Sequence, residues 1–325
     1  MKISKKQIIR YLILFFLIIS INFILPRLMK ADPFLFLSSE GADDISGLSE
    51  KQIEQYFIYY GLDKPLWQQY LYYLKSIFTG NMGFSISKTL PVSTIIFSRI
   101  PWTIGIVLCS LTITILLGIS FGTLSAYYKD NLFGRYSYLF FVILSQIPPF
   151  LIGFGILVMG ASYIPSLPIA GGITPFLAFE WNYEVTMDIL KHAILPILTL
   201  VVARVSHFFM LMRGKMIVEI EKRYVFIEKA KGFGDIYILC RHCLKNAITP
   251  LITEALLSIA LILQGSLIVE NVFEYPGIGK LLKEAVFARD YPLLQGIFLF
   301  MVGITLGVSF ISEIIKENEK MQVHV

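Results

Sequence analysis

Long apolar runs, separated by short charged or turn-forming segments, make up most of the chain. The runs that are long enough to cross a bilayer lie at 8–27, 102–127, 137–162, 193–212, 247–269 and 293–314. A hydrocarbon core about 30 Å thick needs roughly 20 predominantly apolar residues, and backbone polar groups inside lipid must find partners within a helix. The pattern therefore predicts an all-α membrane protein with six transmembrane helices in a lipid bilayer.

The basic residues between these runs predict the topology. Lys and Arg concentrate in 213–246, whereas 163–192 contains only Lys191. Because cytoplasmic loops collect Lys and Arg, we expect both termini in the cytoplasm, and we expect three segments outside: 28–101, 163–192 and 270–292. The formal net charge of +5 then reflects topology, and we expect no binding to nucleic acid.

The N-terminus has a basic start followed by an apolar run, as a secretory signal has. The run is longer than a typical signal, and no small-residue cleavage pattern follows it, so we expect an uncleaved first span. We divide the chain into an N-terminal tail with the first transmembrane helix (1–27), an extracytoplasmic helical insertion (28–101) and a core with five further transmembrane helices (102–325).

The insertion predicts two short amphipathic helices. Ser49 is a suitable N-cap for the first helix and Gly61 a suitable end. The turn at Asp63 to Pro65 would start the second helix, and Gly80 would end it. Tyrosines and Trp67 suit a surface that is apolar on one side and wet on the other.

Few residues suggest chemistry. The segment GIGK at 277–280 lacks the first glycine of a phosphate-binding loop, because Glu274 stands there, and Leu281 follows the lysine. Cys240 and Cys243 have the C-x-x-C spacing, but a zinc site would need a second ligand pair, so we interpret them as packing residues on one helix face. We therefore expect no catalytic residue, no cofactor and no metal in this chain.

Charged residues inside the spans are costly and often functional. Arg204 and His207 lie in the fourth predicted span, and Glu254 lies near the inner end of the fifth. Arg204 and Glu254 either pair or line a polar pathway, or they reach back to the inner membrane surface. Both interpretations stay open at this point.

The basic segment between the fourth and fifth spans predicts two helices with a break. Residues 216–231 favour a helix, Gly232-Phe233-Gly234 interrupt it, and Asp235 is a suitable N-cap for a second helix that ends at Asn246. The second helix combines an apolar stripe (Ile236, Leu239 and Cys243) with a basic face. Such an element, held on the cytoplasmic side, can lie on the membrane or bind a partner protein.

This segment, RYVFIEKAKGFGDIYILCRHCLKNAITP at 223–250, resembles the cytoplasmic coupling loop of ABC importer permeases. It is most similar to the dipeptide/oligopeptide/nickel permease family, and within that family to the oligopeptide permease B type. Members of this family are the inner-membrane components of binding-protein-dependent transport systems. The matching residues are Tyr224, Ala230, Lys231, Gly232, Arg241, His242, Leu244, Asn246, Ala247 and Pro250. Further similar stretches are YGLDKPLWQQYLYYL, GNMGFSI (with Asn81 at the usual Asp position), the VENVFEYPGIG stretch and ARDYPLLQG. The segment around Glu228 and the tail after Ser312 depart from the family pattern.

The resemblance implies the type I ABC importer permease fold and a non-catalytic role in peptide transport across the cell membrane. Its implied partners are a second homologous permease subunit, two cytoplasmic ABC ATPases and an extracytoplasmic substrate-binding protein. The ATPases would contact the coupling loop (213–246) at Tyr224, Glu228, Ala230, Lys231, Gly232, Arg241, His242 and Asn246. Import of nickel or a metal chelate is the alternative within the family, and a stand-alone channel or secondary carrier is the alternative outside it.

Overall fold

The computed structural model describes residues 5–27, 63–175, 177 and 182–323, and its regular elements there are all helices. Five of these helices are long and apolar enough to cross a membrane. They are α1 (Lys5–Arg27), α5 (Val92–Tyr127), α8 (Tyr183–Ile220), α11 (Leu244–Val272) and α13 (Tyr291–Val323). The predicted all-α membrane class is therefore confirmed.

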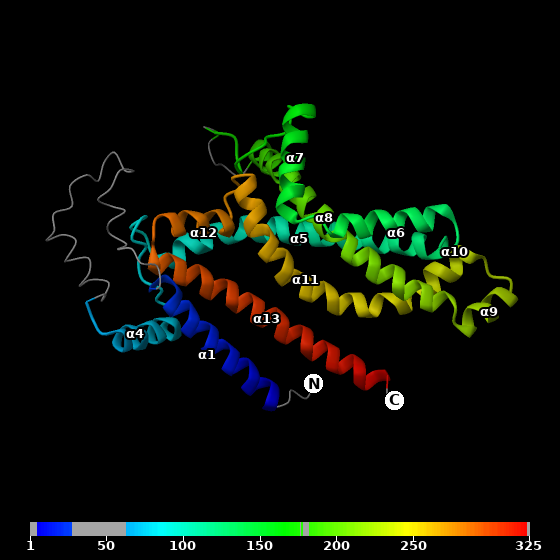
Figure 1. Ribbon diagram of the computed structural model, residues 1–325, viewed down its shortest axis with the longest axis horizontal. Helices are drawn as coiled ribbons and strands as arrows, with labels where there is room; N and C mark the ends of the chain where they lie inside the picture. The colour runs from blue at the N-terminus through cyan, green and yellow to red at the C-terminus, as the bar shows by residue number, and fades with distance from the viewer. Residues whose placement is uncertain (1–4, 28–62, 176, 178–181, 324–325) are drawn as a thin grey trace. The chain divides into compact units, whose positions relative to one another are not determined.

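The third predicted span, 137–162, is not one helix. It consists of α6 (Leu132–Ser145) and α7 (Pro149–Tyr163), which meet at an angle of 102° (Figure 1). Pro148 and Pro149 lie at the bend, where proline lacks the N–H for a helical hydrogen bond and keeps the residue before it out of helical geometry. A sixth span exists only if this bent pair counts as one crossing.

The chain forms two compact units. The first, which we term the core unit, comprises Trp102–Lys280 with Gly307–Val325, and the second, which we term the N-terminal unit, comprises Lys2–Pro101 with Leu281–Leu306. In the core unit, α8 packs against α11, α6 and α7. Its most buried side chains include Phe208, Met212 and Ile262.

Glycines let two helices of the core unit approach closely. Gly118 and Gly122 lie four residues apart on α5, and a Cβ on either would collide with the Cβ of a residue on α8, Phe208 or Met212. This small-residue spacing is typical of helix contacts in membranes, where close backbone approach replaces the hydrophobic driving force.

A buried carboxylate fixes the turn between α11 and α12 (Ile278–Phe287). Glu270 accepts a hydrogen bond from the Thr103 hydroxyl at 2.7 Å and another from the Gly279 N–H at 2.5 Å. A Cβ at Gly277 would collide with the same carboxylate. The conserved-looking spacing of the VENVFEYPGIG stretch thus has a packing reason, since only glycine leaves room for the carboxylate.

In the N-terminal unit, α4 (Leu66–Thr79) is the second amphipathic helix that the sequence predicts, and it follows Pro65. Gly80 ends it in the left-handed conformation at φ 70°. Tyr73 packs its ring against Phe23 of α1 and accepts a hydrogen bond from Asn22 at 2.9 Å. The helix predicted between Ser49 and Gly61 lies outside the described residues.

Two of the sequence stretches quoted above meet in the N-terminal unit. Asp290, which is fully buried, accepts hydrogen bonds from the Ser85 hydroxyl at 2.5 Å and from the N–H and hydroxyl of Ser87 at 2.9 and 2.8 Å. The GNMGFSI stretch is thereby joined to ARDYPLLQG at the start of α13.

Candidate functional site

The segment between α8 and α11 folds into a helical hairpin, which we term the coupling segment (residues 221–246). It contains α9 (Arg223–Ala230), α10 (Asp235–Ile238) and a π-helical turn, η1 (Leu239–Cys243), that runs directly into α11. Figure 1 shows α9 and α10 beyond the ends of α8 and α11. The prediction of a second helix that ends at Asn246 is therefore wrong, because that helix continues through η1 into the membrane span.

Gly232 ends α9 in a defined capping motif. Its φ is +86°, its N–H donates to the carbonyl of Lys229, and the N–H of Phe233 donates to the carbonyl of Glu228. These two bonds are those of a Schellman motif, in which the residue after the C-cap is left-handed and is usually glycine. The predicted left-handed break at Gly232 is confirmed. The N-cap of α10 is Gly234 and not Asp235 as predicted.

Glu219, near the end of α8, joins three helices. Its Oε1 accepts hydrogen bonds from the Tyr224 hydroxyl of α9 at 2.7 Å and from the Asn246 amide of α11 at 2.9 Å. Its Oε2 lies 2.6 Å from the ammonium of Lys222. Glu219 is only 5% exposed, whereas Lys222 and Asn246 are exposed. These bonds are charge-assisted and therefore stronger than bonds between neutral groups. We term these four residues the Glu219 cluster.

Burial raises the pKa of two side chains at this place, Tyr224 and Cys243. Burial, and after it the hydrogen bond to Glu219, raises the pKa of Tyr224, so its hydroxyl stays a donor near neutral pH. Burial likewise raises the pKa of Cys243, whose sulfur lies 3.7 Å from the Tyr224 hydroxyl. Cys240, in contrast, is exposed. The interpretation that both cysteines pack on one buried face is therefore wrong, and Ile236 of the predicted apolar stripe is also exposed, at 76%.

Weaker, exposed contacts attach the hairpin to α5 and to the turn after it. The Asp235 carboxylate lies 2.9 Å from the Lys229 ammonium and accepts a hydrogen bond from the Tyr127 hydroxyl at 2.9 Å. These two bonds, with that from Lys229 the larger influence, lower the pKa of Asp235. Lys129 and Glu221 form a second exposed pair at 2.5 Å. Exposed pairs of this kind contribute little to stability, because water screens both charges.

The outer surface of the hairpin is apolar and aromatic. Phe226 is 66% exposed, and Ile227, Phe233 and Tyr237 are also exposed, together with Ile236. The rings of Phe233 and Tyr237 stack with centroids 5.1 Å apart. Exposed apolar side chains grouped in this way are typical of a surface that binds another protein.

The eight residues predicted as contacts of a partner fall into two groups. Tyr224 and Asn246 both bind Glu219 at the end of α8, so they attach the hairpin to the membrane helices. The other six lie at or near its surface: Glu228 and Lys231 pair at 3.0 Å, His242 packs edge-on against Tyr237, and Ala230, Gly232 and Arg241 are exposed. Sequence reasoning missed Glu219, Lys222 and Tyr127. The one sequence feature that could have marked Glu219 as important is its position as a carboxylate at the end of an apolar run.

The charged residues within the spans lie on one side of the antiparallel pair α8 and α11. The Glu254 carboxylate lies 2.9 Å from His207 Nε2, and an Arg204 amine donates to the carbonyl of Leu261 at 3.1 Å. The hypothesis that Arg204 pairs with Glu254 is therefore wrong. Gln264, one helical face along from Glu254, is exposed as well. We term Arg204, His207, Glu254 and Gln264 the polar strip of this pair of apolar helices.

The model of the family described as "Binding-protein-dependent transport system inner membrane component" matches residues 114–318. A putative peptide transport system permease protein of Brucella suis biovar 1 (strain 1330) is 27% identical over 304 residues, which cover 94% of this chain and 93% of the relative. A probable peptide ABC transporter permease protein of Sinorhizobium fredii is 27% identical over 298 residues, 90% of this chain and 89% of the relative. The dipeptide transport system permease protein DppB of Escherichia coli K12 is 24% identical over 311 residues, 91% of this chain and 90% of the relative.

Proposed function

Because the chain belongs to the family of binding-protein-dependent transport system inner membrane components, we propose that it is the membrane-spanning permease subunit of an ATP-driven importer of peptides. The observation that carries the proposal is similarity over about nine-tenths of the chain to relatives whose names specify peptide or dipeptide transport. The chain has the type I importer permease fold that the family implies. In this proposal it catalyses no reaction, because its partners hydrolyse the ATP.

The coupling segment is the surface on which we place the cytoplasmic ATPases. Its exposed apolar residues, Phe226 and Ile236 above all, provide a hydrophobic contact, and the Glu219 cluster holds the hairpin to α8 and α11. Two ATPases would serve two permease subunits, this chain and a homologous one. The basic residues of 213–246 support a cytoplasmic position for this side, and we propose the same side for both termini.

The polar strip on α8 and α11 is the part of the chain that we assign to the transport pathway. A charge such as Arg204 or Glu254 in contact with lipid at mid-span is costly, so this side is better placed against water and the second permease subunit. An extracytoplasmic binding protein would deliver the peptide to the opposite end of these helices from the coupling segment.

A transport assay with matched variants tests the proposal. The full complex is expressed in cells that lack peptide uptake, and the uptake of a labelled dipeptide, a labelled tetrapeptide and a labelled nickel chelate is measured with and without ATP depletion. We expect ATP-dependent peptide uptake. Ile236→Glu should abolish uptake and the co-purification of the ATPase, whereas Leu132→Glu, the same change at an exposed residue of α6, should leave both intact.

Uptake of the nickel chelate alone would contradict the peptide assignment. Peptide uptake that persists after ATP depletion, or in the Ile236→Glu complex, would contradict the coupling role of the hairpin. The two results are separable, because the first concerns the substrate and the second the attachment of the ATPase.

A further inference from the structure

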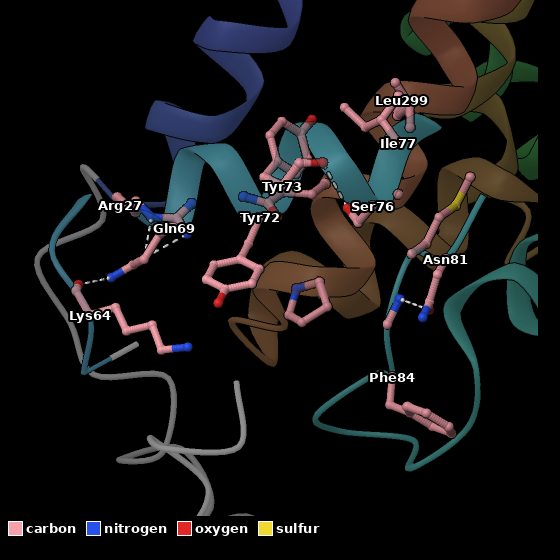
Figure 2. A pocket seen from close by; sticks show the side chains of 15 residues that line it. Arg27, Lys64, Gln69, Tyr72, Tyr73, Ser76, Ile77, Asn81, Phe84 and Leu299 are labelled. Atoms are coloured by element: carbon pink, nitrogen blue, oxygen red, sulfur yellow. Dashed lines mark hydrogen bonds between the residues drawn. The ribbon is translucent and has the colours of Figure 1, made fainter. Parts of the chain in front are cut away.

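The N-terminal unit contains a cavity of about 460 Å³ beside the end of α1 (Figure 2). Side chains from the end of α1, from α4, from the turn after it and from the first turns of α13 line it. They include Arg27, Lys64, Tyr72, Tyr73, Asn81 and Gln295. The volume lies within the range of sites that bind small molecules in proteins, about 300–1,000 Å³.

Two cations line this cavity, and no carboxylate of the described residues pairs with either. The guanidinium of Arg27 donates to Gln69 Oε1 at 3.1 and 2.8 Å and to the carbonyl of Phe23 at 2.8 Å. The ammonium of Lys64 lies 4.4 Å from the centre of the Tyr72 ring. Figure 2 shows Arg27 held against Gln69, and Lys64 beside Tyr72. Arginine carries about five N–H donors, so some of those on Arg27 remain for a ligand.

The remaining wall supplies neutral donors. Asn81 lines the cavity, and its side-chain carbonyl accepts a hydrogen bond from the Gly83 N–H at 3.1 Å, which leaves its amide N–H groups to donate. The hydroxyl of Tyr73 accepts from Asn22 at 2.9 Å, which leaves its proton to donate. Burial raises the pKa of Tyr73 to about 12 and lowers that of Arg27 to about 10. At neutral pH the first is therefore a neutral donor and the second a cation.

The cavity adjoins the end of one apolar span and the beginning of another, so we place it near the level of a membrane surface. The apolar span of α1 ends at Ile24, and Arg27 follows it by three residues, which is about 4.5 Å along a helix. Next to it, α4 exposes an apolar stripe of Trp67, Leu71 and Phe78, at 62%, 55% and 71%. Aromatic and apolar side chains of this kind are typical of helices in the headgroup region.

We propose that this cavity binds a phosphate group at the membrane surface, carried by a phospholipid headgroup or by a soluble phosphate ester. The arginine fork matches phosphate oxygens, and the lysine adds a point charge. Amide and phenol donors complete the set. The end of the apolar span of α1 beside the cavity favours the lipid, because a headgroup lies at this level when its acyl chains lie along α1. This proposal concerns the N-terminal unit alone and does not depend on the transported substrate.

Native mass spectrometry of the delipidated full complex in detergent tests this proposal. The probes are phosphatidylglycerol, diacylglycerol with the same acyl chains, and inorganic phosphate. We expect phosphatidylglycerol to bind at least tenfold more tightly than diacylglycerol. The double variant Arg27→Gln/Lys64→Gln should lose at least tenfold in affinity for phosphatidylglycerol. Lys75→Gln, which removes an exposed lysine of α4 outside the cavity, should bind as the wild type does.

The probes also distinguish the two sources of phosphate. Displacement of phosphatidylglycerol by millimolar inorganic phosphate supports a soluble ester as the ligand, and the absence of displacement supports the lipid. Equal binding of phosphatidylglycerol and diacylglycerol to the wild type would overturn the proposal, and this comparison needs no variant that folds. Equal losses in the double variant and in Lys75→Gln would overturn it as well.

Discussion

The Glu219 cluster makes the sharpest prediction, because one hydroxyl can be removed from it while the carboxylate keeps its other partners. Tyr224→Phe deletes the donor that lies 2.7 Å from a carboxylate that is 5% exposed. Glu219 keeps its bonds to Asn246 and Lys222, so the buried charge is not left without partners. The substitution therefore weakens the attachment of α9 to α8 and should leave the membrane helices folded.

The magnitude follows from the kind of bond that is lost. A hydrogen bond to a charged group contributes about 1.5–3 kcal/mol, and about 1.4 kcal/mol changes an equilibrium tenfold. The population of complexes in which α9 is detached from α8 should therefore rise roughly ten- to hundredfold. Glu219→Gln removes the charge from all three bonds at once, and we expect a larger effect from it.

Hydrogen–deuterium exchange of the full complex in nanodiscs measures this population through peptides that cover 223–230. Tyr237→Phe is the matched control, because Tyr237 is exposed and its hydroxyl makes no hydrogen bond within the described residues. Exchange in α9 should quicken in Tyr224→Phe and stay at the wild-type rate in the control. ATP hydrolysis stimulated by the binding protein should fall in the same variant.

A double-mutant cycle tests whether the residues act through one carboxylate. If they do, adding Tyr224→Phe to Glu219→Gln should cost much less than Tyr224→Phe costs alone, since the charge it depends on is already gone. Additive effects, or equal exchange in Tyr224→Phe and Tyr237→Phe, would refute the role that we assign to this cluster.

Three further predictions concern residues whose surroundings are equally specific. Gly232→Ala should destabilise the end of α9 by about 1–2 kcal/mol, because alanine is strained at a left-handed φ; Gly234→Ala, at an ordinary φ, should not, and local exchange rates compare the two. A maleimide that cannot cross membranes should modify exposed Cys240 much faster than buried Cys243 at neutral pH, because burial also raises the pKa of Cys243. On the proposed topology, the maleimide should reach Cys240 only from the cytoplasmic side. Gly118→Leu should overpack the contact between α5 and α8 at a cost of about 1–3 kcal/mol or more, seen as a loss of monodisperse complex in size-exclusion chromatography.

The features that the sequence predicted correctly depend on short stretches of the chain. Hydropathy over about 20 residues locates a span wherever it is folded, so five helices lie where the apolar runs place them. Glycine is the residue that takes a positive φ at the lowest cost, so the ends of helices at Gly80 and Gly232 were also predictable. The bend at Pro148 was signalled by the proline pair, but the apolar run across it favoured one continuous helix.

The features that could not be predicted depend on contacts between distant segments. Tyr224 and Asn246 stand 22 residues apart, and nothing in their spacing indicates that both bind Glu219. The sequence does not show that the helix continues from η1 into α11, because no capping residue or glycine stands at this point. Without such a residue, the sequence cannot distinguish the end of a helix from its continuation. From the sequence, either His207 or Arg204 could pair with Glu254. The packing of α8 on α11 brings His207 to it.

The strengths of the attachments indicate how a movement of the coupling segment would travel. An exposed hydrogen bond from Tyr127 to Asp235 and an exposed ion pair between Lys129 and Glu221 connect the hairpin to α5 and the turn after it. The Glu219 cluster joins the hairpin to α8 and α11 by bonds to a buried carboxylate, and exposed charge contacts are the weaker of the two kinds. A pull on α9 would therefore break the contacts to Tyr127 and Lys129 before those to Glu219, and α8 and α11 would move with the hairpin. These two helices also carry Arg204 and Glu254. On the proposed function, the ATPase thus acts directly on the helices that line the pathway, and no separate relay is needed between coupling and transport.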